Sequence, residues 1–188
     1  MKAPMIIIAA PSGAGKSSFV KKIIAELEDL RDTITYTTRE MRRGESEGEP
    51  YHFVSQEKFN QLIKEDFFVE WAQVHGNLYG TPLYQIEEAW EEGKTVIMDV
   101  DVQGAKTFKS KYPEAATIFI IPPSIQELRR RVVDREGEPP ADLELRMKNA
   151  EVEMAHADSF DHQLVNDDFE ESYGQFRTLI YKLLEKTP

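Results

Sequence analysis

Residues 5–17 read Met5-Ile6-Ile7-Ile8-Ala9-Ala10-Pro11-Ser12-Gly13-Ala14-Gly15-Lys16-Ser17, and this stretch decides the fold. An apolar run typical of a buried strand ends at Ala9, and a loop with two glycines follows. Lys16 and Ser17 then open a helical pattern whose apolar positions are Phe19, Val20, Ile23, Ile24, Leu27 and Leu30. A strand, a glycine loop, a Lys-Ser pair and a helix in this order predict a phosphate-binding P-loop.

The residue types of the loop suit phosphate binding. Glycines let backbone N–H groups turn toward phosphate oxygens. The lysine reaches the outer phosphates, the hydroxyl after it binds Mg²⁺, and the helix N-terminus adds positive potential. The usual pattern starts with glycine where this chain has Ala10, which is tolerated at negative φ and costs about 1–2 kcal/mol at positive φ. The alternative is a glycine-rich turn with a surface lysine, but the position between a strand and a helix favours the P-loop.

Length and composition fit one domain with a sizeable core. The 188 residues carry a formal net charge of −11 and no cysteine. A disulfide framework and thiolate metal sites are therefore excluded. No apolar run reaches the ~20 residues that span a bilayer, and no signal-peptide pattern opens the chain, so we expect a cytoplasmic protein. The negative charge argues against nucleic acid or a membrane surface as partner, and it requires phosphate-binding arginines to be gathered locally.

Buried-strand patterns recur along the chain, at residues 5–9, 95–100, 117–121 and 163–165. Helical patterns lie between them, and an amphipathic helix at 169–184 closes the chain. This alternation predicts an α/β fold with a mostly parallel sheet flanked by helices. We expect a single domain whose core is formed by residues 1–32, 95–123 and 160–188.

Two segments interrupt this core. Residues 33–94 carry short β-like pieces and glycine turns, which indicate an inserted, mostly β, partly antiparallel subdomain. Residues 124–159 begin with the capping box Ser124-Ile-Gln-Glu127 and contain the break Gly137-Glu-Pro-Pro140. Two helices around such a hinge are typical of a mobile lid.

The basic residues form two groups, Arg39, Arg42 and Arg43 in the first insertion and Arg129, Arg130, Arg131, Arg135 and Arg146 in the second. One interpretation is that these arginines are solvated and paired with nearby glutamates. For Arg43, Arg129 and Arg130 this interpretation is at least as good as a role in phosphate binding. Phosphoryl transfer offers a second interpretation, because cations around the transferring group lower its barrier. A lid would bring arginines over the P-loop and exclude water. The apolar strand ending at Asp99 has the pattern of a magnesium-ordering acid.

Further stretches, taken in order, resemble the motifs of the guanylate kinase family. They are Thr37–Glu45, Gly48–Val54, Glu70–Ala72, His75–Thr81, Met98–Gly104, Pro122–Ser124 and Val165–Asp168. The resemblance covers essentially the whole chain and is far more specific than the P-loop alone. It implies a P-loop NTPase-type sheet with a nucleotide-acceptor insertion and a helical lid, and Mg²⁺-dependent transfer of the γ-phosphate of ATP to GMP. The insertion at 33–94 is then the GMP-binding part.

The resemblance also implies residue roles. ATP is held by Ala10, Pro11, Ser12, Gly13, Ala14, Gly15, Lys16, Ser17, Ser18, Arg131 and Asn166, the last near the adenine. GMP is held by Thr35, Arg39, Arg42, Tyr51, Glu70, Tyr79, Thr81 and Asp101, with dGMP a further candidate acceptor. Lys16, Arg39, Arg135 and Arg146 are the implied catalytic residues, and Ser17 and Asp99 the implied magnesium ligands.

A physical check supports the role of Glu70. Guanine presents two adjacent donors, N1–H and the N2 amine, which one carboxylate accepts together, whereas adenine has an acceptor at N1 and no N2 amine. Sites built on such hydrogen bonds discriminate by about 10⁴. The competing interpretations are an exposed strand carboxylate for Glu70, half-buried sheet aromatics for Tyr51 and Tyr79, and turn arginines tied to local glutamates for Arg39 and Arg42.

Some features depart from the family pattern. Besides Ala10, Pro50 precedes Tyr51 in place of a polar residue, and Glu136 follows Arg135 where Arg-Gly is common. Two other functions fit parts of this sequence. A non-catalytic guanylate-kinase-like module that binds phosphopeptides has little use for an intact Lys16 loop and lid arginines, and typically belongs to a longer scaffold chain. A P-loop kinase acting on a phosphorylated sugar has no use for Glu70, Tyr79 and Thr81 together.

Overall fold

A five-stranded parallel sheet forms the centre of the computed structural model, which describes residues 4–42, 44–74 and 76–185. The strand order is β10-β9-β1-β8-β2, with all neighbouring strands parallel. Its strands are β1 (Met5–Ala9), β2 (Leu30–Arg31), β8 (Thr95–Val100), β9 (Ala116–Ile121) and β10 (His162–Val165). The predicted α/β fold with a parallel sheet is confirmed. Strand β2 is not predicted from the sequence, because two residues are too few to show the hydrophobic pattern of a strand. Arg43 and His75 lie outside the described residues.

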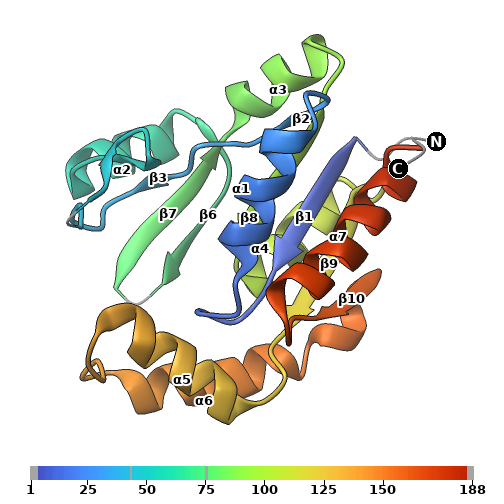
Figure 1. Cartoon of the computed structure of the whole chain (residues 1–188). Coiled ribbons are helices and arrows are strands. Elements are labelled where there is room, and N and C mark those ends of the chain that lie inside the picture. Colours follow the sequence, from blue (N-terminus) through green and yellow to red (C-terminus); the bar gives the residue numbers. More distant parts are fainter. Residues whose placement is uncertain (1–3, 43, 75, 186–188) are drawn as a thin grey trace.

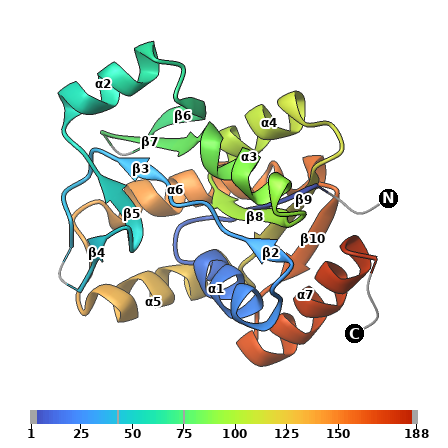
Figure 2. The ribbon, with the colours of Figure 1, turned by 90° about the horizontal axis from the view of Figure 1, so that it is seen from above.

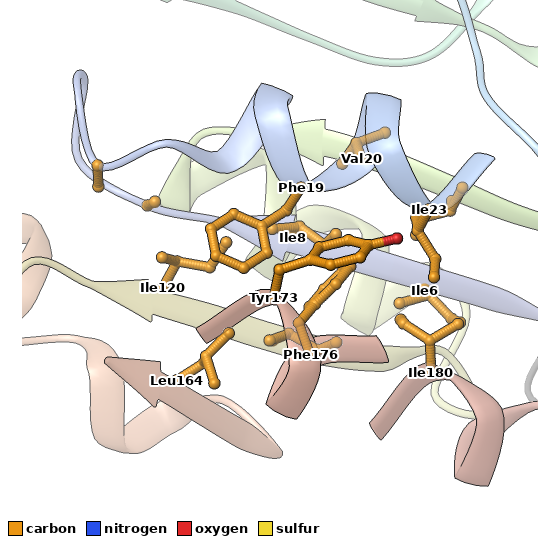
Figure 3. Packing of buried hydrophobic residues seen from close by; sticks show 14 of the residues in the cluster. Ile6, Ile8, Phe19, Val20, Ile23, Ile120, Leu164, Tyr173, Phe176 and Ile180 are labelled. Atoms are coloured by element: carbon orange, nitrogen blue, oxygen red, sulfur yellow. The ribbon is translucent and has the colours of Figure 1, made fainter. Parts of the chain in front are cut away.

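Both faces of this sheet are buried under helices (Figures 1 and 2). Helices α1 (Lys16–Glu26) and α7 (Phe169–Leu183) cover one face, and α3 (Leu83–Glu91) and α4 (Val102–Lys111) pack on the other. Side chains alternate along β1: Ile6 and Ile8 join Phe19, Phe176 and Ile180 on the α1–α7 side, as Figure 3 shows. Ile7 points to the opposite cluster. Burial on both faces explains why β1 is a continuous apolar run rather than an alternating one.

The first insertion contains a second sheet, with strand order β4-β5-β3-β7-β6. Its strands are β3 (Tyr36–Thr37), β4 (Ser46–Glu47), β5 (Pro50–Phe53), β6 (Phe68–Val74) and β7 (Asn77–Pro82). The pairs β3–β7 and β6–β7 are antiparallel and the pairs β3–β5 and β4–β5 are parallel, so the predicted partly antiparallel arrangement is confirmed.

Helix α2 (Gln56–Lys64) in this insertion was not predicted. Ser55 caps it by accepting a hydrogen bond from the backbone N–H of Lys58, and Phe59 and Leu62 are buried. The serine cap and the apolar spacing are both visible in the sequence, so this helix could have been found.

The second insertion is a pair of helices, α5 (Ile125–Glu136) and α6 (Leu143–Met154), followed by the short 3₁₀ helix η1 (Ala157–Ser159). The predicted cap is present, because the Ser124 hydroxyl accepts from the Glu127 N–H at 3.0 Å. Gly137 ends α5 with φ of +80°. The pair lies along one end of the molecule (gold to orange in Figure 1), next to the P-loop and the β6–β7 hairpin. Among the described helices, none is long and apolar enough to cross a membrane.

Candidate active site

The P-loop connects β1 to α1 and fits tightly against its neighbours. Gly13 and Gly15 have φ of +93° and +97°, and helix α1 begins at Lys16 directly after Gly15. A Cβ at Gly13 would lie 2.8 Å from Val132 Cγ2, and one at Gly15 would lie 2.7 Å from Asn166 Nδ2. Both positions therefore require glycine for conformation and for space. Ala10 is not one of the non-glycine residues with positive φ in the described chain, so its alanine carries no such cost.

One cleft of about 620 Å³ collects most of the predicted site residues. It lies between the P-loop, the second sheet and the α5–α6 pair. The predicted residues that line it are Ala10, Ser12, Gly13, Gly15, Lys16, Ser17, Ser18, Thr35, Arg39, Arg42, Tyr51, Glu70, Tyr79, Thr81, Asp99, Asp101, Arg131, Arg135 and Arg146. Pro11, Ala14 and Asn166 are not among its lining residues. The fold thus brings together side chains that are more than one hundred residues apart in the sequence.

Ser17 and Asp99 meet at the P-loop end of the cleft. The Ser17 hydroxyl donates to Asp99 Oδ2 at 2.8 Å. The contact follows from the sheet, since Asp99 on β8 is in register with Ile8 on β1, next to the point where the loop leaves β1. A hydroxyl and a carboxylate are hard oxygen donors of the type that Mg²⁺ prefers. Within the described ranges, no group of three or more His, Cys, Asp or Glu residues could hold a metal ion. The donor set fits Mg²⁺, which usually takes few protein ligands and completes its shell with water and phosphate oxygens.

Glu70 lies in the opposite part of the cleft, on β6. Its cross-strand neighbour Thr81 on β7 donates a hydrogen bond to Glu70 Oε1 at 3.3 Å. Asp101 caps α4 by accepting from the Gly104 N–H at 2.6 Å. Burial first, and the nearby charge of Asp101 second, raise the pKa of Glu70 to about 7, against smaller opposing effects of Thr81 and Lys111. The carboxylate is thus held in a partly desolvated position on the wall of the cleft.

Arg39 and two tyrosines form a third part of the wall. Arg39 makes two hydrogen bonds to Glu45, at 2.9 and 3.0 Å, and its guanidinium carbon lies 5.3 Å from the centre of the Tyr51 ring. The Tyr51 and Tyr79 rings meet edge to face at 5.8 Å. Burial and the charge of Asp99 raise the pKa of Tyr51 to about 12, so its hydroxyl stays a donor at neutral pH. Arg39 is tied to a local glutamate, as the competing interpretation required, yet both residues line the cleft.

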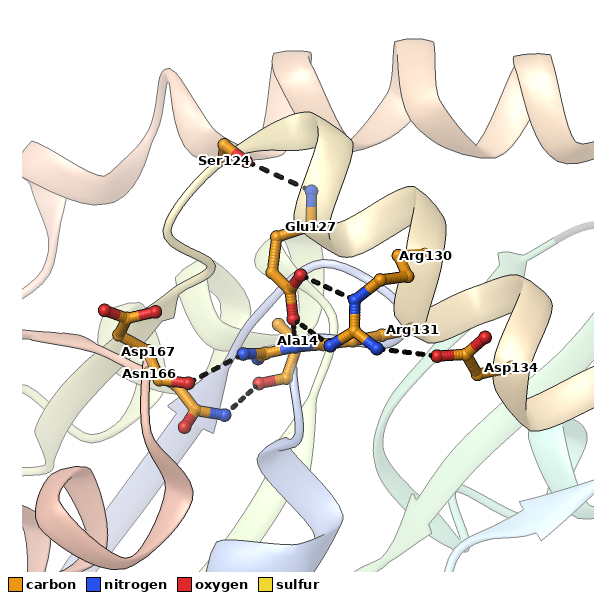
Figure 4. Close-up of polar contacts among 8 residues, drawn as sticks. All are labelled: Ala14, Ser124, Glu127, Arg130, Arg131, Asp134, Asn166 and Asp167. Atoms are coloured by element: carbon orange, nitrogen blue, oxygen red, sulfur yellow. Dashed lines mark hydrogen bonds and ion pairs between the residues drawn. The ribbon is translucent and has the colours of Figure 1, made fainter.

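The arginines of the helix pair divide into two groups. Arg129 pairs with Glu144, and Arg130 pairs with Glu127 and Asp134. None of these residues is buried or lines the cleft, which agrees with solvated helix arginines. The cleft-lining arginines Arg131, Arg135 and Arg146 are also hydrogen-bonded. As Figure 4 shows, Arg131 donates to Glu127 Oε1 at 2.8 Å and to the Asp167 carbonyl at 2.9 Å.

Asn166 lies behind the P-loop rather than in the cleft. It is 3% exposed, and its amide nitrogen donates to the Ala14 carbonyl at 2.8 Å (Figure 4). Its Oδ1 atom has no hydrogen-bond partner among the described residues. The side chain therefore supports the backbone of the loop, a role that the sequence does not predict.

Sequence reasoning missed Glu153 on α6, which also lines the cleft. Its pKa is raised by burial, an effect that the charge of Lys16 opposes and that of Asp101 reinforces. Nothing in the sequence distinguishes this residue from the other acidic residues of α6, because its position depends on how the helix lies across the P-loop.

The comparisons with known proteins agree with this geometry. The family model described as guanylate kinase matches residues 2–183. A guanylate kinase of Bdellovibrio bacteriovorus is 58% identical over 98% of this chain and 100% of its own length, and one of Wolinella succinogenes is 45% identical over 91% and 80%. The crystal structure of a guanylate kinase from Anaplasma phagocytophilum, 30% identical, covers 99% of this chain and 88% of its own with a TM-score of 0.81. This chain belongs to the guanylate kinase family.

Proposed function

We propose that the cleft binds ATP and GMP together and transfers the γ-phosphoryl group of ATP to GMP, giving ADP and GDP. One observation carries the proposal: the P-loop residues Lys16 and Ser17, the half-buried Glu70 and the buried Thr81 line the same cleft. In the transfer, an oxygen of the GMP phosphate forms a bond to the γ-phosphorus as the bond to the β,γ-bridging oxygen breaks. Because the GMP phosphate is the nucleophile, alignment and charge stabilisation supply the catalysis.

The donor side is assigned to the P-loop. Residues 10–18 hold the ATP phosphates through backbone N–H groups, and Lys16 contacts the outer phosphates. Arg131, Arg135 and Arg146 approach the same phosphates from the helix pair. The position of Gly15 at the N-terminus of α1 and the arginines that line the cleft support these assignments. The adenine-side role of Asn166 rests on the resemblance alone, because its side chain contacts Ala14 and does not line the cleft.

The acceptor side is assigned to the second sheet. Glu70 accepts the N1–H and N2 amine of guanine, with Thr35, Thr81 and Asp101 around the base. Arg39, Arg42, Tyr51 and Tyr79 hold the phosphate of GMP. Arg39 has the planar donor geometry for this task and lies on aromatic rings that fix its orientation. Lys16, Arg39, Arg135 and Arg146 are the proposed catalytic residues.

Ser17 and Asp99 are the proposed protein ligands for Mg²⁺ or for its water shell. The hydroxyl and the carboxylate, 2.8 Å apart, fit the oxygen chemistry of this ion. When bound, Mg²⁺ neutralises charge on the phosphate oxygens of ATP.

Residues 124–159 are proposed to act as a lid on a core of residues 1–32, 95–123 and 160–188, with residues 33–94 as the GMP-binding part. Closure would place the lid arginines on the phosphates and exclude water. Small-angle scattering with and without both nucleotides tests this, since closure requires compaction and an unchanged radius of gyration refutes it.

The test of the function is ADP release with ATP and Mg²⁺, using GMP, dGMP, AMP, CMP and UMP as acceptors. Release only with the guanine nucleotides, abolished in Lys16→Ala and retained in the exposed control Lys182→Ala, is expected. Binding of GMP without release by any acceptor would contradict the proposal and favour the non-catalytic module.

A further inference from the structure

Glu136 occupies a position that helix energetics do not explain. It is the last residue of α5, and Gly137 ends the helix with φ of +80°. A carboxylate at a helix C-terminus is unfavourable because the helix dipole leaves negative potential there. Its surroundings must therefore account for it.

The Glu136 carboxylate joins two arginines from different helices. Its Oε1 atom accepts from Arg135 Nη2 at 2.9 Å and from Arg146 Nη1 at 2.6 Å, so α5 and α6 are linked through one oxygen. Asp142 accepts from the Nε atom of Arg146 at 3.0 Å. Two guanidinium groups this close repel each other, and the negative charge between them cancels that repulsion. The pKa of Glu136 is lowered because the hydrogen bonds and charges of the arginines outweigh its burial.

Glu136 and its two arginine partners differ in whether they line the cleft. Arg135 and Arg146 line it, and Glu136 does not. The carboxylate thus contacts the arginines from outside the cleft lining and takes one N–H from each, and Asp142 takes one more from Arg146. A guanidinium has five N–H donors, so both arginines keep donors for an anion in the cleft.

We propose that Glu136 is a positioning residue that holds Arg135 and Arg146 as one unit for the phosphates of the bound nucleotides. The inference rests on the proposed role of these arginines in phosphoryl transfer. Two charges that arrive in fixed relative geometry stabilise a transition state without reorganisation at the moment of reaction. Partly exposed ion pairs contribute little to the free energy of unfolding. We therefore expect replacement of Glu136 to change kcat rather than stability.

The experiment compares steady-state kinetics of Glu136→Ala, Glu136→Gln and the exposed control Glu138→Gln. We expect Glu136→Ala to lower kcat about tenfold or more. The KM for ATP should stay unchanged or fall, because the lid gains one positive charge. Glu136→Gln should have a kcat between those of the parent protein and Glu136→Ala, since its amide oxygen accepts both hydrogen bonds but carries no charge to offset the repulsion between the arginines. Glu138→Gln should match the parent protein. The proposal is refuted if the kcat of Glu136→Ala lies within twofold of that of the parent protein. It is also refuted if the KM for ATP rises by the same factor by which kcat falls.

A mutant cycle separates this inference from the function on which it rests. If Glu136 acts through the arginines, Glu136→Ala should have no further effect on kcat in a variant that already carries Arg135→Ala and Arg146→Ala. An equal fall in kcat in that background refutes the positioning role. If the two arginine substitutions leave kcat intact in the parent chain, the proposed function of the lid arginines fails instead. Thermal melts of each variant exclude unfolding of the helix pair as the cause.

Discussion

Replacing Glu70 by glutamine should make the nucleotide-free protein more stable at neutral pH. Burial and the charge of Asp101 raise the pKa of Glu70 from 4.5 to about 7. A carboxylate whose pKa is higher in the folded than in the unfolded state favours folding only while it is protonated. Its favourable contribution is therefore complete below pH 4.5, declines as the pH rises, and is absent above pH 7. Glutamine does not titrate and keeps an oxygen that can accept from Thr81.

The size of the effect follows from the two pKa values. One pKa unit corresponds to 1.36 kcal/mol, so Glu70→Gln should raise the free energy of unfolding by up to about 3 kcal/mol at pH 8 and by only about 1 kcal/mol at pH 5. Urea denaturation at a series of pH values measures the difference directly. The exposed Glu88→Gln on α3 is the matched control, since it removes the same charge from the surface.

A stability gain that is independent of pH would refute this reasoning, because it would mean that glutamine packs better rather than that a buried charge was removed. Equal gains for Glu70→Gln and Glu88→Gln would refute it as well, by assigning the effect to net charge. The same substitution should abolish the preference for GMP over AMP in the ADP-release assay. Gained stability with lost selectivity would show that the desolvated carboxylate is retained for recognition.

Three further results are expected. The KM for GMP should rise about tenfold per pH unit below pH 7 in the parent protein and not in Glu70→Gln, because guanine requires the ionised carboxylate; parallel pH profiles would contradict this. Gly15→Ala should lower the melting temperature and weaken ATP binding, since alanine at φ of +97° costs about 1–2 kcal/mol and its Cβ contacts the amide of Asn166. Adding Asn166→Ala removes the contact but not the backbone strain, so it should restore only part of the loss. Full recovery would mean that the strain at this φ is not the cause. Arg39→Lys should raise the KM for GMP tenfold or more, because an ammonium group lacks the planar, two-pronged donor geometry with which a guanidinium binds phosphate. Titration of GMP at saturating ATP measures the change, and an unchanged KM would remove Arg39 from the phosphate site.

The central sheet was predictable because its strands are buried on both faces. Continuous apolar runs marked β1, β8 and β9, and the P-loop fixed the helix that follows β1. The edge strand β10 is different, because only Leu164 of its four residues is buried. Strand β2 has only two residues, and it exists because it pairs with β8 rather than because of its own sequence.

The candidate site was predictable where the chemistry of a sequence motif requires one type of side chain at one position. Lys16, Glu70 and Asp99 are residues of this kind, and all three line the cleft. The positions of Asn166 and Glu153 could be known only from the three-dimensional structure. The contact of Asn166 with Ala14 joins residues at opposite ends of the chain, and the place of Glu153 depends on the path of α6. Short sequence spacings carry no information about such contacts.

The net charge of −11 raises the question of how this protein attracts polyanions. In the described chain, the arginines Arg39, Arg131 and Arg146 all line the cleft, and all are hydrogen-bonded to carboxylates. A carboxylate that occupies part of a guanidinium leaves the other donors free and restricts the rotamer, so the arginine is oriented before the phosphate arrives. The pairing also relieves the repulsion that several unpaired cations would create in one cleft. In the proposed function, recognition of phosphate then depends on the direction of the remaining N–H groups and on the backbone amides of the loop. An overall acidic composition is compatible with that arrangement, because the acidic residues in the cleft hold the basic ones in place.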